Sequence, residues 1–245
     1  MVSGGLGDIG QAIALELARQ GANVALGDVR PASDAAPFLG ELRSLGINAS
    51  YAAVDVTDSA AVGTWVMSVE KELGLATIII PNAGIVTQAE VCVLRAEDWS
   101  RQIGVNLDGA FHLAQQGAIQ MVKRKSPGNV VFIGSWAAHA PHRALAAYCV
   151  AKAGVRMLCQ CLALELASCH ILVNEVAPGY VNAGLSKQIW DKHPGLRDQS
   201  LQRVPVGDLI RPDEVARQVV ALCHPDNRHM TGSVVLMDGG LSLLR

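Results

Sequence analysis

The stretch Ser3-Gly4-Gly5-Leu6-Gly7-Asp8-Ile9-Gly10 opens directly into the helix-like segment 11–20. Glycines let the backbone come close to a pyrophosphate, whose charge is then held by the N–H groups at the start of the helix. The next strand-like run ends on Asp28, eighteen residues after Gly10, where an acid binds the ribose hydroxyls of a dinucleotide. Three spaced glycines are weak support alone, so the rest of the chain decides whether this beginning belongs to a dinucleotide-binding fold.

Strand-like and helix-like segments alternate along the whole chain. The expected strands are the apolar runs 23–28, 49–54, 77–80, 130–134, 171–176 and 234–237. The expected helices lie near 9–20, 36–45, 59–73, 97–125, 145–167 and 212–223. This alternation, with continuously apolar strands, predicts an α/β fold in which helices cover both faces of a parallel sheet.

Size and composition fit a single domain over residues 1–245, since neither a linker nor a repeat divides the chain. The net charge of −2 gives no support for a nucleic-acid partner. The mean hydropathy of +0.27 is high, but no uninterrupted apolar run reaches the ~18 residues of a membrane span. We therefore expect no membrane partner and attribute the hydropathy to buried strands and subunit interfaces.

The six cysteines show neither the spacing of a metal site nor a C-x-x-C redox pair. The start of the sequence lacks the charged segment and apolar run of a secretory signal. We therefore expect a reduced, cytoplasmic location and no metal.

Residues 135–152 carry the pattern with the clearest chemistry. Tyr148 and Lys152 are four apart, so on a helix their side chains lie on the same face. A nearby ammonium lowers the pKa of a phenol, ordinarily about 10, and such a pair can exchange a proton with an alcohol or a carbonyl. Ser135 ends the apolar run before it, where its hydroxyl can hydrogen-bond the substrate oxygen beside the tyrosine. The alternative is a tyrosine packed in the core and a lysine that reaches for solvent.

Two further segments lie where strands of the predicted sheet end. Asp55 is placed to meet an adenine amino group, and the alternative is that this turn only caps the next helix through Thr57 or Asp58. The segment Pro81-Asn82-Ala83-Gly84 follows the fourth strand, in the crevice where ligands bind in such sheets.

Together these motifs resemble the short-chain dehydrogenase/reductase family over essentially the whole chain. The motifs that carry the resemblance are the glycine-rich start, Asp28, Asp55, Asn82-Ala83-Gly84, Val105-Asn106, Ser135, Tyr148-x-x-x-Lys152, Pro178-Gly179 and Asp238-Gly239-Gly240. The resemblance implies a Rossmann-type doubly wound parallel sheet of about seven strands. It also implies a catalytic tetrad of Asn106, Ser135, Tyr148 and Lys152.

The same resemblance assigns roles to these residues. Tyr148 is the acid/base, and Ser135 orients the substrate oxygen. Lys152 binds the nicotinamide ribose and lowers the Tyr148 pKa, while Asn106 holds a water that links Lys152 to solvent. The implied cofactor-binding residues are Gly4, Gly7, Asp8, Ile9, Gly10, Asp28, Asp55, Val56, Asn82, Gly84, Tyr148, Lys152, Pro178, Gly179 and Val181. We expect NAD rather than NADP, because a 2′-phosphate would meet the charge of Asp28, which Arg30 two residues on only softens.

The sequence departs from the family pattern at four places. Asp8 replaces the middle glycine of the fingerprint, close to the expected pyrophosphate, and we expect its side chain to turn away. Pro81 replaces an asparagine, which we expect the fold to tolerate. Ala183 stands where a threonine commonly contacts the nicotinamide carboxamide, a role that Asn182 would have to take over. Only two residues precede the glycine-rich stretch, so either the first strand is very short or the sequence starts late.

The segment 182–203 is expected to form the substrate lid. Its polar composition favours a hydroxyl-rich ligand such as a sugar or polyol over a steroid or a long acyl chain, although solvated loops are charged in any case. The candidates for the substrate pocket are Trp136, His139, His142, Tyr180 and Trp190. For the two histidines, ordinary loop positions are the favoured interpretation.

The segment 145–167 is apolar nearly all round, with Lys152, Arg156 and Glu165 as its charged residues. A helix that covers a sheet with one face normally has a polar opposite face, so we expect a partner subunit there. The resemblance implies the same pairing, and the tail that begins at Asp238 resembles a second interface. We predict a homotetramer, or otherwise a homodimer.

The leading hypothesis is an NAD-dependent dehydrogenase of a secondary alcohol, with a sugar or polyol as its small-molecule substrate. The rival enzyme is a reductase of 3-oxoacyl thioesters, against which Asp28 and the polar lid argue. The rival of another class is a non-catalytic NAD-binding sensor or scaffold. Asp8, Ala183 and the short first strand favour that rival, and the intact tetrad argues against it.

Overall fold

The computed structural model describes residues 1–193 and 195–244. The described strands are β1 (Val2–Ser3), β2 (Val24–Asp28), β3 (Ala49–Ala53), β4 (Ile78–Ile79), β5 (Gly128–Ile133), β6 (Ile171–Pro178) and β7 (Val234–Met237). They pair in parallel as β1-β2-β3 and as β4-β5-β6-β7. The two halves meet where Val2 bridges Ile80 and the Ser3 N–H donates to the Ile80 carbonyl oxygen at 3.1 Å. The strand order therefore runs 3-2-1-4-5-6-7 and reverses between β1 and β4.

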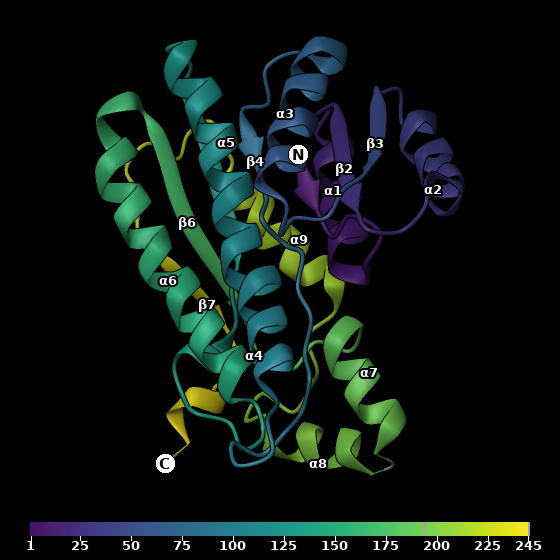
Figure 1. Ribbon diagram of the computed structural model, residues 1–245, viewed down its shortest axis with the longest axis vertical. Coiled ribbons are helices and arrows are strands. Elements are labelled where there is room, and N and C mark those ends of the chain that lie inside the picture. The colour runs from purple at the N-terminus through teal and green to yellow at the C-terminus, as the bar shows by residue number, and fades with distance from the viewer. Residues whose placement is uncertain (194, 245) are drawn as a thin grey trace.

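Helices cover both faces of this sheet (Figure 1). On one face lie α1 (Asp8–Arg19), α2 (Ala32–Ser44) and α9 (Pro212–Leu222), packed on a core that includes Ile13, Leu26 and Val219. On the other lie α3 (Ser59–Leu73), α5 (Gly109–Lys123) and α6 (Ala146–Leu166), on a core that includes Ile79, Leu113 and Phe132. All six named side chains are 0% exposed. They are buried because the strands are apolar on both faces and the helices pack their apolar sides against them. The predicted doubly wound α/β fold is confirmed.

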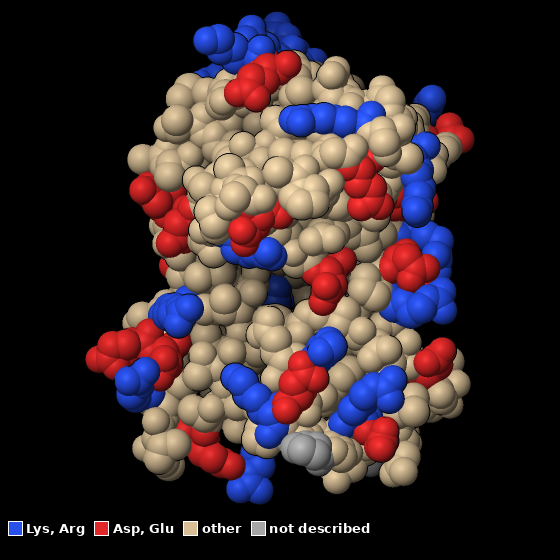
Figure 2. All heavy atoms as spheres, turned by 90° about the vertical axis from the view of Figure 1, so that its right-hand side faces the viewer, with Lys and Arg blue, Asp and Glu red and all other residues tan. Residues whose placement is uncertain are grey.

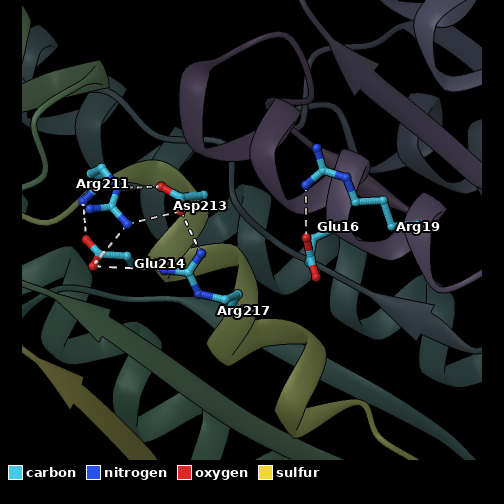
Figure 3. A network of polar contacts seen from close by, with 6 residues as sticks. All are labelled: Glu16, Arg19, Arg211, Asp213, Glu214 and Arg217. Carbon is cyan, nitrogen blue, oxygen red and sulfur yellow. Dashed lines mark hydrogen bonds and ion pairs between the residues drawn. The ribbon is translucent and has the colours of Figure 1, made fainter.

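Several polar contacts lie at the start of α9, the helix that packs along α1 (Figure 3). The Glu214 carboxylate accepts a hydrogen bond from the Arg211 backbone N–H at 2.7 Å, and Asp213 pairs with Arg217 at 2.6 Å. A separate exposed pair on α1 joins Glu16 and Arg19 at 3.2 Å. Exposed pairs of this kind add a few tenths of a kcal/mol each, so apolar packing holds the two helices to the sheet.

Two predicted helices differ from the structure, and the predicted lid segment contains helices that the sequence did not show. The single helix expected over 97–125 is wrong, because a π-helical turn at Gly104–Asp108 separates α4 (Ala96–Ile103) from α5. A π turn holds an extra residue and often marks a functional site. The helix expected from residue 36 begins at Ala32. The expected lid 182–203 contains two helices, α7 (Gly184–Lys192) and α8 (Leu196–Arg203), whose polar composition gives little apolar periodicity.

Helix α6 is unusually apolar for its position. Within the described residues, one helical stretch, Ala146–Cys169, is long and apolar enough to cross a membrane by length and composition alone. In the fold it lies along β6, and a core helix passes the same test. Its outer surface exposes Val150, Met157 and Leu164 by 49%, 59% and 83%. Gln160 and Glu165 are exposed as well, so the outer face of α6 is largely but not wholly apolar, as the sequence predicted.

Candidate active site

The carboxyl ends of the central strands open into one cleft with a cavity of about 650 Å³. Every residue predicted to bind the cofactor lines this cavity. Figure 2 shows the surface hollowed between an upper and a lower part, with acidic side chains at the rim and a basic side chain inside. The cleft lies where the strand order reverses, which is the place where doubly wound sheets bind ligands.

The glycine-rich turn makes one end of the cleft a site for an anion. Gly4 has a left-handed φ of +61°, and a Cβ on it would lie 2.9 Å from the Ala83 Cα. A Cβ on Gly10 would lie 2.2 Å from the Gly4 carbonyl oxygen, so the turn closes tightly only with glycine there. Helix α1 begins immediately after the turn, and its first N–H groups have no partner within the helix. These donors fit a pyrophosphate.

Ser3 and Asn82 hold this turn against the end of β4. The Ser3 hydroxyl accepts hydrogen bonds from the backbone N–H groups of Asn82 and Ala83 at 3.0 and 3.1 Å. The Asn82 amide donates in return to the carbonyl oxygens of Ser3 and Gly4 at 2.9 and 3.1 Å. Proline in place of asparagine at position 81 leaves the bonding to β5 intact, because the Pro81 carbonyl oxygen accepts the Ile133 N–H at 3.1 Å.

Asp28 lies in the cavity wall at the end of β2. Its carboxylate accepts hydrogen bonds from the backbone N–H groups of Leu6 and Arg30, at 3.1 and 3.3 Å. The Arg30 guanidinium pairs instead with Asp34 at 3.0 Å and reaches the Leu6 carbonyl oxygen at 3.4 Å. Asp28 thus faces the cleft without a salt bridge to Arg30.

Asp55 and Asp58 divide the two roles that the sequence left open. The Asp58 carboxylate caps α3 by accepting the N–H groups of Ala60 and Ala61 at 2.9 and 3.0 Å. Asp55 lines the cavity, and its carboxylate is held by the N–H and hydroxyl of Thr57 at 2.9 and 2.8 Å. The capping interpretation is therefore correct for Asp58, which leaves Asp55 in the wall of the cleft.

Ser135, Tyr148 and Lys152 come together at the floor of the cleft. Ser135 follows β5, and its hydroxyl accepts the Ala137 N–H at 3.1 Å, which starts a short 3-10 turn. Tyr148 lies in the first turn of α6 and Lys152 one turn later, with the ammonium 5.7 Å from the centre of the phenol ring. The Lys152 ammonium donates to the Ile133 carbonyl oxygen at 2.8 Å. One strand end and one helix face thus supply all three groups.

The two titrating groups of this site have shifted pKa values because they are buried. Burial raises the pKa of Tyr148 to about 12, against a hydrogen bond with the Ser135 side chain that lowers it. Burial lowers the pKa of Lys152 to about 8, against the Glu175 carboxylate, which raises it. The net shift of the Tyr148 pKa is thus upward and set by burial, and a lowering contribution from Lys152 stays a prediction. Burial disfavours the charged form of each group, the phenolate of Tyr148 and the ammonium of Lys152.

Asn106 lies beside the cleft and outside its lining. It is 1% exposed in the π turn and uses both ends of its amide on the backbone of Ile85. Its carbonyl accepts the Ile85 N–H and its NH₂ donates to the Ile85 carbonyl oxygen, both at 2.9 Å. These bonds hold the segment after Gly84 in place. The water link expected from the resemblance stays a prediction.

Four of the five substrate-pocket candidates, Trp136, His142, Tyr180 and Trp190, gather in an aromatic cluster next to the lid. None of the five candidates lines the described cavity. The Trp136 ring lies 4.2 Å from the His142 ring and 5.3 Å from the Tyr180 ring. Trp190 of α7 lies 6.4 Å from Tyr180, and its indole N–H donates to the Ser200 hydroxyl at 3.2 Å. Burial lowers the pKa of His139, and nearby Arg156 lowers it further. The cluster packs the lid onto the body of the protein, and substrate contact by these residues stays a prediction.

Sequence reasoning missed several residues of the cleft. Arg101 of α4 lines the cavity one turn before Val105, and this i, i+4 spacing is the signal that places both on one helix face. From the lid, Ser186 and Gln188 also line the cavity. In the described part of the chain no group of three or more His, Cys, Asp or Glu side chains is arranged to hold a metal.

A buried ion pair next to Ser135 was also missed. Glu175 of β6 is 0% exposed and pairs with Arg156 of α6 through two N–O distances of 3.2 Å. Its carboxylate fills the space over Gly134, where a Cβ would come within 1.9 Å of it. The Arg156 guanidinium also donates to the Ser135 carbonyl oxygen at 3.5 Å. The sequence does contain a signal for this pair, because Glu175 is a charged residue within an otherwise largely apolar strand.

Comparisons with known proteins agree with this fold and site. A family model described as enoyl-(acyl carrier protein) reductase matches residues 5–242. The 3-oxoacyl-(acyl-carrier-protein) reductase of Thermotoga maritima is 30% identical over 98% of this chain and 96% of its own. The 2,3-dihydro-2,3-dihydroxybenzoate dehydrogenase of Bacillus subtilis is 31% identical over 99% of this chain and 95% of its own. The solved gluconate 5-dehydrogenase of Burkholderia cenocepacia, in complex with NADP and tartrate, is 29% identical with a TM-score of 0.93, over 100% of this chain and 94% of that one.

The chain belongs to the short-chain dehydrogenase/reductase family. It is an oxidoreductase that acts on CH–OH groups and uses a nicotinamide dinucleotide. The glycine turn, the open N-terminus of α1 and Asp28 fit such a cofactor on geometry alone.

Proposed function

We propose that this enzyme is an NAD-dependent dehydrogenase of a secondary alcohol, with a sugar or polyol as substrate. The observation that carries the proposal is the cleft itself. It joins Asp28 at the cofactor end to Ser135, Tyr148 and Lys152 at the other end. Asp28 at the cofactor end and the proton-transfer groups at the other end together fit the oxidation of an alcohol.

The residues of the floor divide the work of that oxidation. The dinucleotide, when bound, supplies the hydride acceptor. The Ser135 hydroxyl holds the substrate oxygen beside Tyr148, and the phenolate takes the hydroxyl proton as the carbinol hydrogen leaves with its electron pair. Lys152 holds the cofactor ribose and places positive charge near the phenol. Because burial raises the pKa of Tyr148 to about 12, this charge and that of the oxidised nicotinamide are needed to populate the phenolate.

The preference for NAD over NADP is proposed from Asp28. A 2′-phosphate bound there would meet the Asp28 carboxylate, and the guanidinium of the neighbouring Arg30 is paired with Asp34. The Burkholderia cenocepacia structure contains NADP, so this fold can also hold the phosphorylated cofactor. The residue at the end of β2 then decides between them.

The substrate class is proposed from the lid. Ser186 and Gln188 bring a hydroxyl and an amide to the cavity, and these groups suit hydrogen bonding to a hydroxyl-rich molecule. The named activity of the Burkholderia cenocepacia enzyme is of this kind. Reduction of a 3-oxoacyl thioester is the second candidate, because curated relatives such as the Thermotoga maritima enzyme carry that name. A non-catalytic sensor is disfavoured, since the groups needed for proton transfer lie together.

We further propose a homotetramer, or otherwise a homodimer, in the cytoplasm. The exposed Val150, Met157 and Leu164 on α6 form an apolar surface of the kind that subunits bury against each other. The six cysteines are free in the structure, which fits a reducing compartment. Size-exclusion chromatography with light scattering measures the assembly directly.

Calorimetry with NAD⁺ and NADP⁺, followed by a substrate panel, tests the proposal. The panel contains sugars, polyols, sugar acids and, in the reverse direction, 3-oxoacyl thioesters, each read as a change in NADH absorbance. Tighter binding of NAD⁺ and turnover of one hydroxylated compound would support it. Turnover of the thioesters alone would replace it with the second candidate, and binding without any turnover would favour the sensor.

A further inference from the structure

The carboxylate of Asp8 reaches across the cleft to the lid. Its Oδ2 accepts a hydrogen bond from the Gly184 N–H at 2.7 Å, between residues 176 positions apart in the sequence. Asp8 is the first residue of α1, and Gly184 is the first residue of the lid helix α7. The bond therefore joins the starts of two helices on opposite walls of the cavity, which both residues line.

Helix α7 has no cap of its own at this end. Its N-cap position is Ala183, which has no side-chain acceptor for the first N–H groups of the helix. Serine, threonine or aspartate normally supplies that acceptor. Gly184 has a left-handed φ of +54°, and the N–H that α7 leaves unpaired at its first residue is bonded to Asp8. Two of the four departures from the family pattern thus meet here, because Asp8 bonds the residue that follows Ala183.

The charge of Asp8 acts in the same direction as the hydrogen bond. A carboxylate is stabilised at the N-terminus of a helix, and an N–H that donates to a charged acceptor makes a stronger bond than a neutral pair. The lid also places Lys187 near this carboxylate. The Asp191 carboxylate raises the pKa of Lys187, and Asp8 contributes in the same direction.

We propose that Asp8 is a positioning residue that tethers the lid helix α7 to the glycine-rich turn and so holds the cleft closed over the cofactor site. The tether is separate from the aromatic cluster at Trp190, which fixes the far end of α7. Its effect on the cofactor has two parts, because the carboxylate orders the lid but repels a pyrophosphate bound at α1. The cofactor part of this inference rests on the proposed function, whereas the lid part does not.

Two substitutions separate the hydrogen bond from the charge. Asp8→Asn removes the charge and keeps an oxygen that accepts the Gly184 N–H, and Asp8→Ala removes both. Without cofactor, hydrogen exchange of the amides of α7 should be about five-fold faster in Asp8→Ala, the change expected for loss of one helix cap, and close to the unchanged protein in Asp8→Asn. Asp191→Asn is the matched control, because it removes a carboxylate of α7 that pairs with Lys187 at 2.8 Å and has no bond to α1 among the described residues.

A third variant distinguishes a tether from a local cap. Ala183→Ser in the Asp8→Ala background gives α7 a cap of its own but no link to α1. The tether predicts that exchange near Gly184 stays fast in this double variant. Full rescue would overturn the proposal, because Asp8 would then only cap a helix, and unchanged exchange in Asp8→Ala would overturn it as well.

Calorimetry with NAD⁺ supplies the functional readout. Asp8→Asn should bind NAD⁺ at least as tightly as the unchanged protein, and Asp8→Ala about five-fold more weakly than Asp8→Asn, because both lack the charge and only one keeps the tether. Equal affinity of the two variants would contradict the tether. If neither the unchanged protein nor any variant binds NAD⁺, the proposed function is contradicted. The hydrogen-exchange result then decides by itself whether Asp8 tethers α7.

Discussion

Replacement of Arg156 by methionine should destabilise the protein strongly, because it leaves the Glu175 carboxylate buried without its partner. Glu175 is 0% exposed, Arg156 is 16% exposed, and the pair is bidentate at 3.2 Å. Breaking a buried pair from one side costs about 3–5 kcal/mol. At roughly 2–4 °C per kcal/mol for a chain of this size, the thermal midpoint should fall by about 6–20 °C.

The assay is thermal and urea unfolding at neutral pH, with Arg19→Met as the matched control. Arg19 is 58% exposed and pairs with Glu16 on the surface of α1 (Figure 3), so its loss should cost less than about 1 kcal/mol. The double variant Arg156→Met with Glu175→Gln removes the stranded charge and should recover most of the loss. Equal unfolding midpoints for Arg156→Met and Arg19→Met would refute this account of the pair. A double variant less stable than Arg156→Met alone would refute it as well.

Further predictions concern the cleft. Because burial raises the pKa of Tyr148 to about 12, the rate of alcohol oxidation should rise with pH from 6 to 10 as the phenolate becomes populated, and a flat rate profile would count against Tyr148 as the base. Asp28→Ser should raise the NADP⁺ to NAD⁺ affinity ratio about ten-fold or more by removing the charge that opposes a 2′-phosphate, and calorimetry showing no change would place the cofactor choice elsewhere. Gly10→Ala puts a Cβ 2.2 Å from the Gly4 oxygen and should cost most dinucleotide binding in the same assay. Gly40→Ala on α2, where a Cβ meets nothing within 4 Å, is its control and should slightly raise the thermal midpoint.

Much of the fold and site could be predicted because it depends on local sequence. The end of β2 at Asp28 and the shared helix face of Tyr148 and Lys152 follow from apolar runs and from helical spacing. The carboxyl ends of parallel strands meet at one edge of the sheet, so motifs that follow strands come together in space. For this reason all the predicted cofactor residues line one cavity.

The remainder depends on contacts between distant segments. The bond from Asp8 to Gly184 joins two walls of the cleft, and no local pattern predicts where a side chain on one wall will find a donor on the other. The raised Tyr148 pKa reflects burial of the finished cleft, which the i, i+4 spacing does not reveal. The π turn around Asn106 extends an otherwise regular helical pattern by one residue, so periodicity alone predicted a single helix.

The measurement that tests the central claim most directly is the rate of NADH formation by the unchanged protein and by Tyr148→Phe, on the compound that the panel identifies. The account predicts a loss of about 10²-fold or more for Tyr148→Phe, with NAD⁺ binding by calorimetry retained, because the phenol only transfers the proton. A Tyr148→Phe enzyme that keeps most of its turnover would contradict the assignment of Tyr148 as the acid/base, and with it the mechanism built on this cleft.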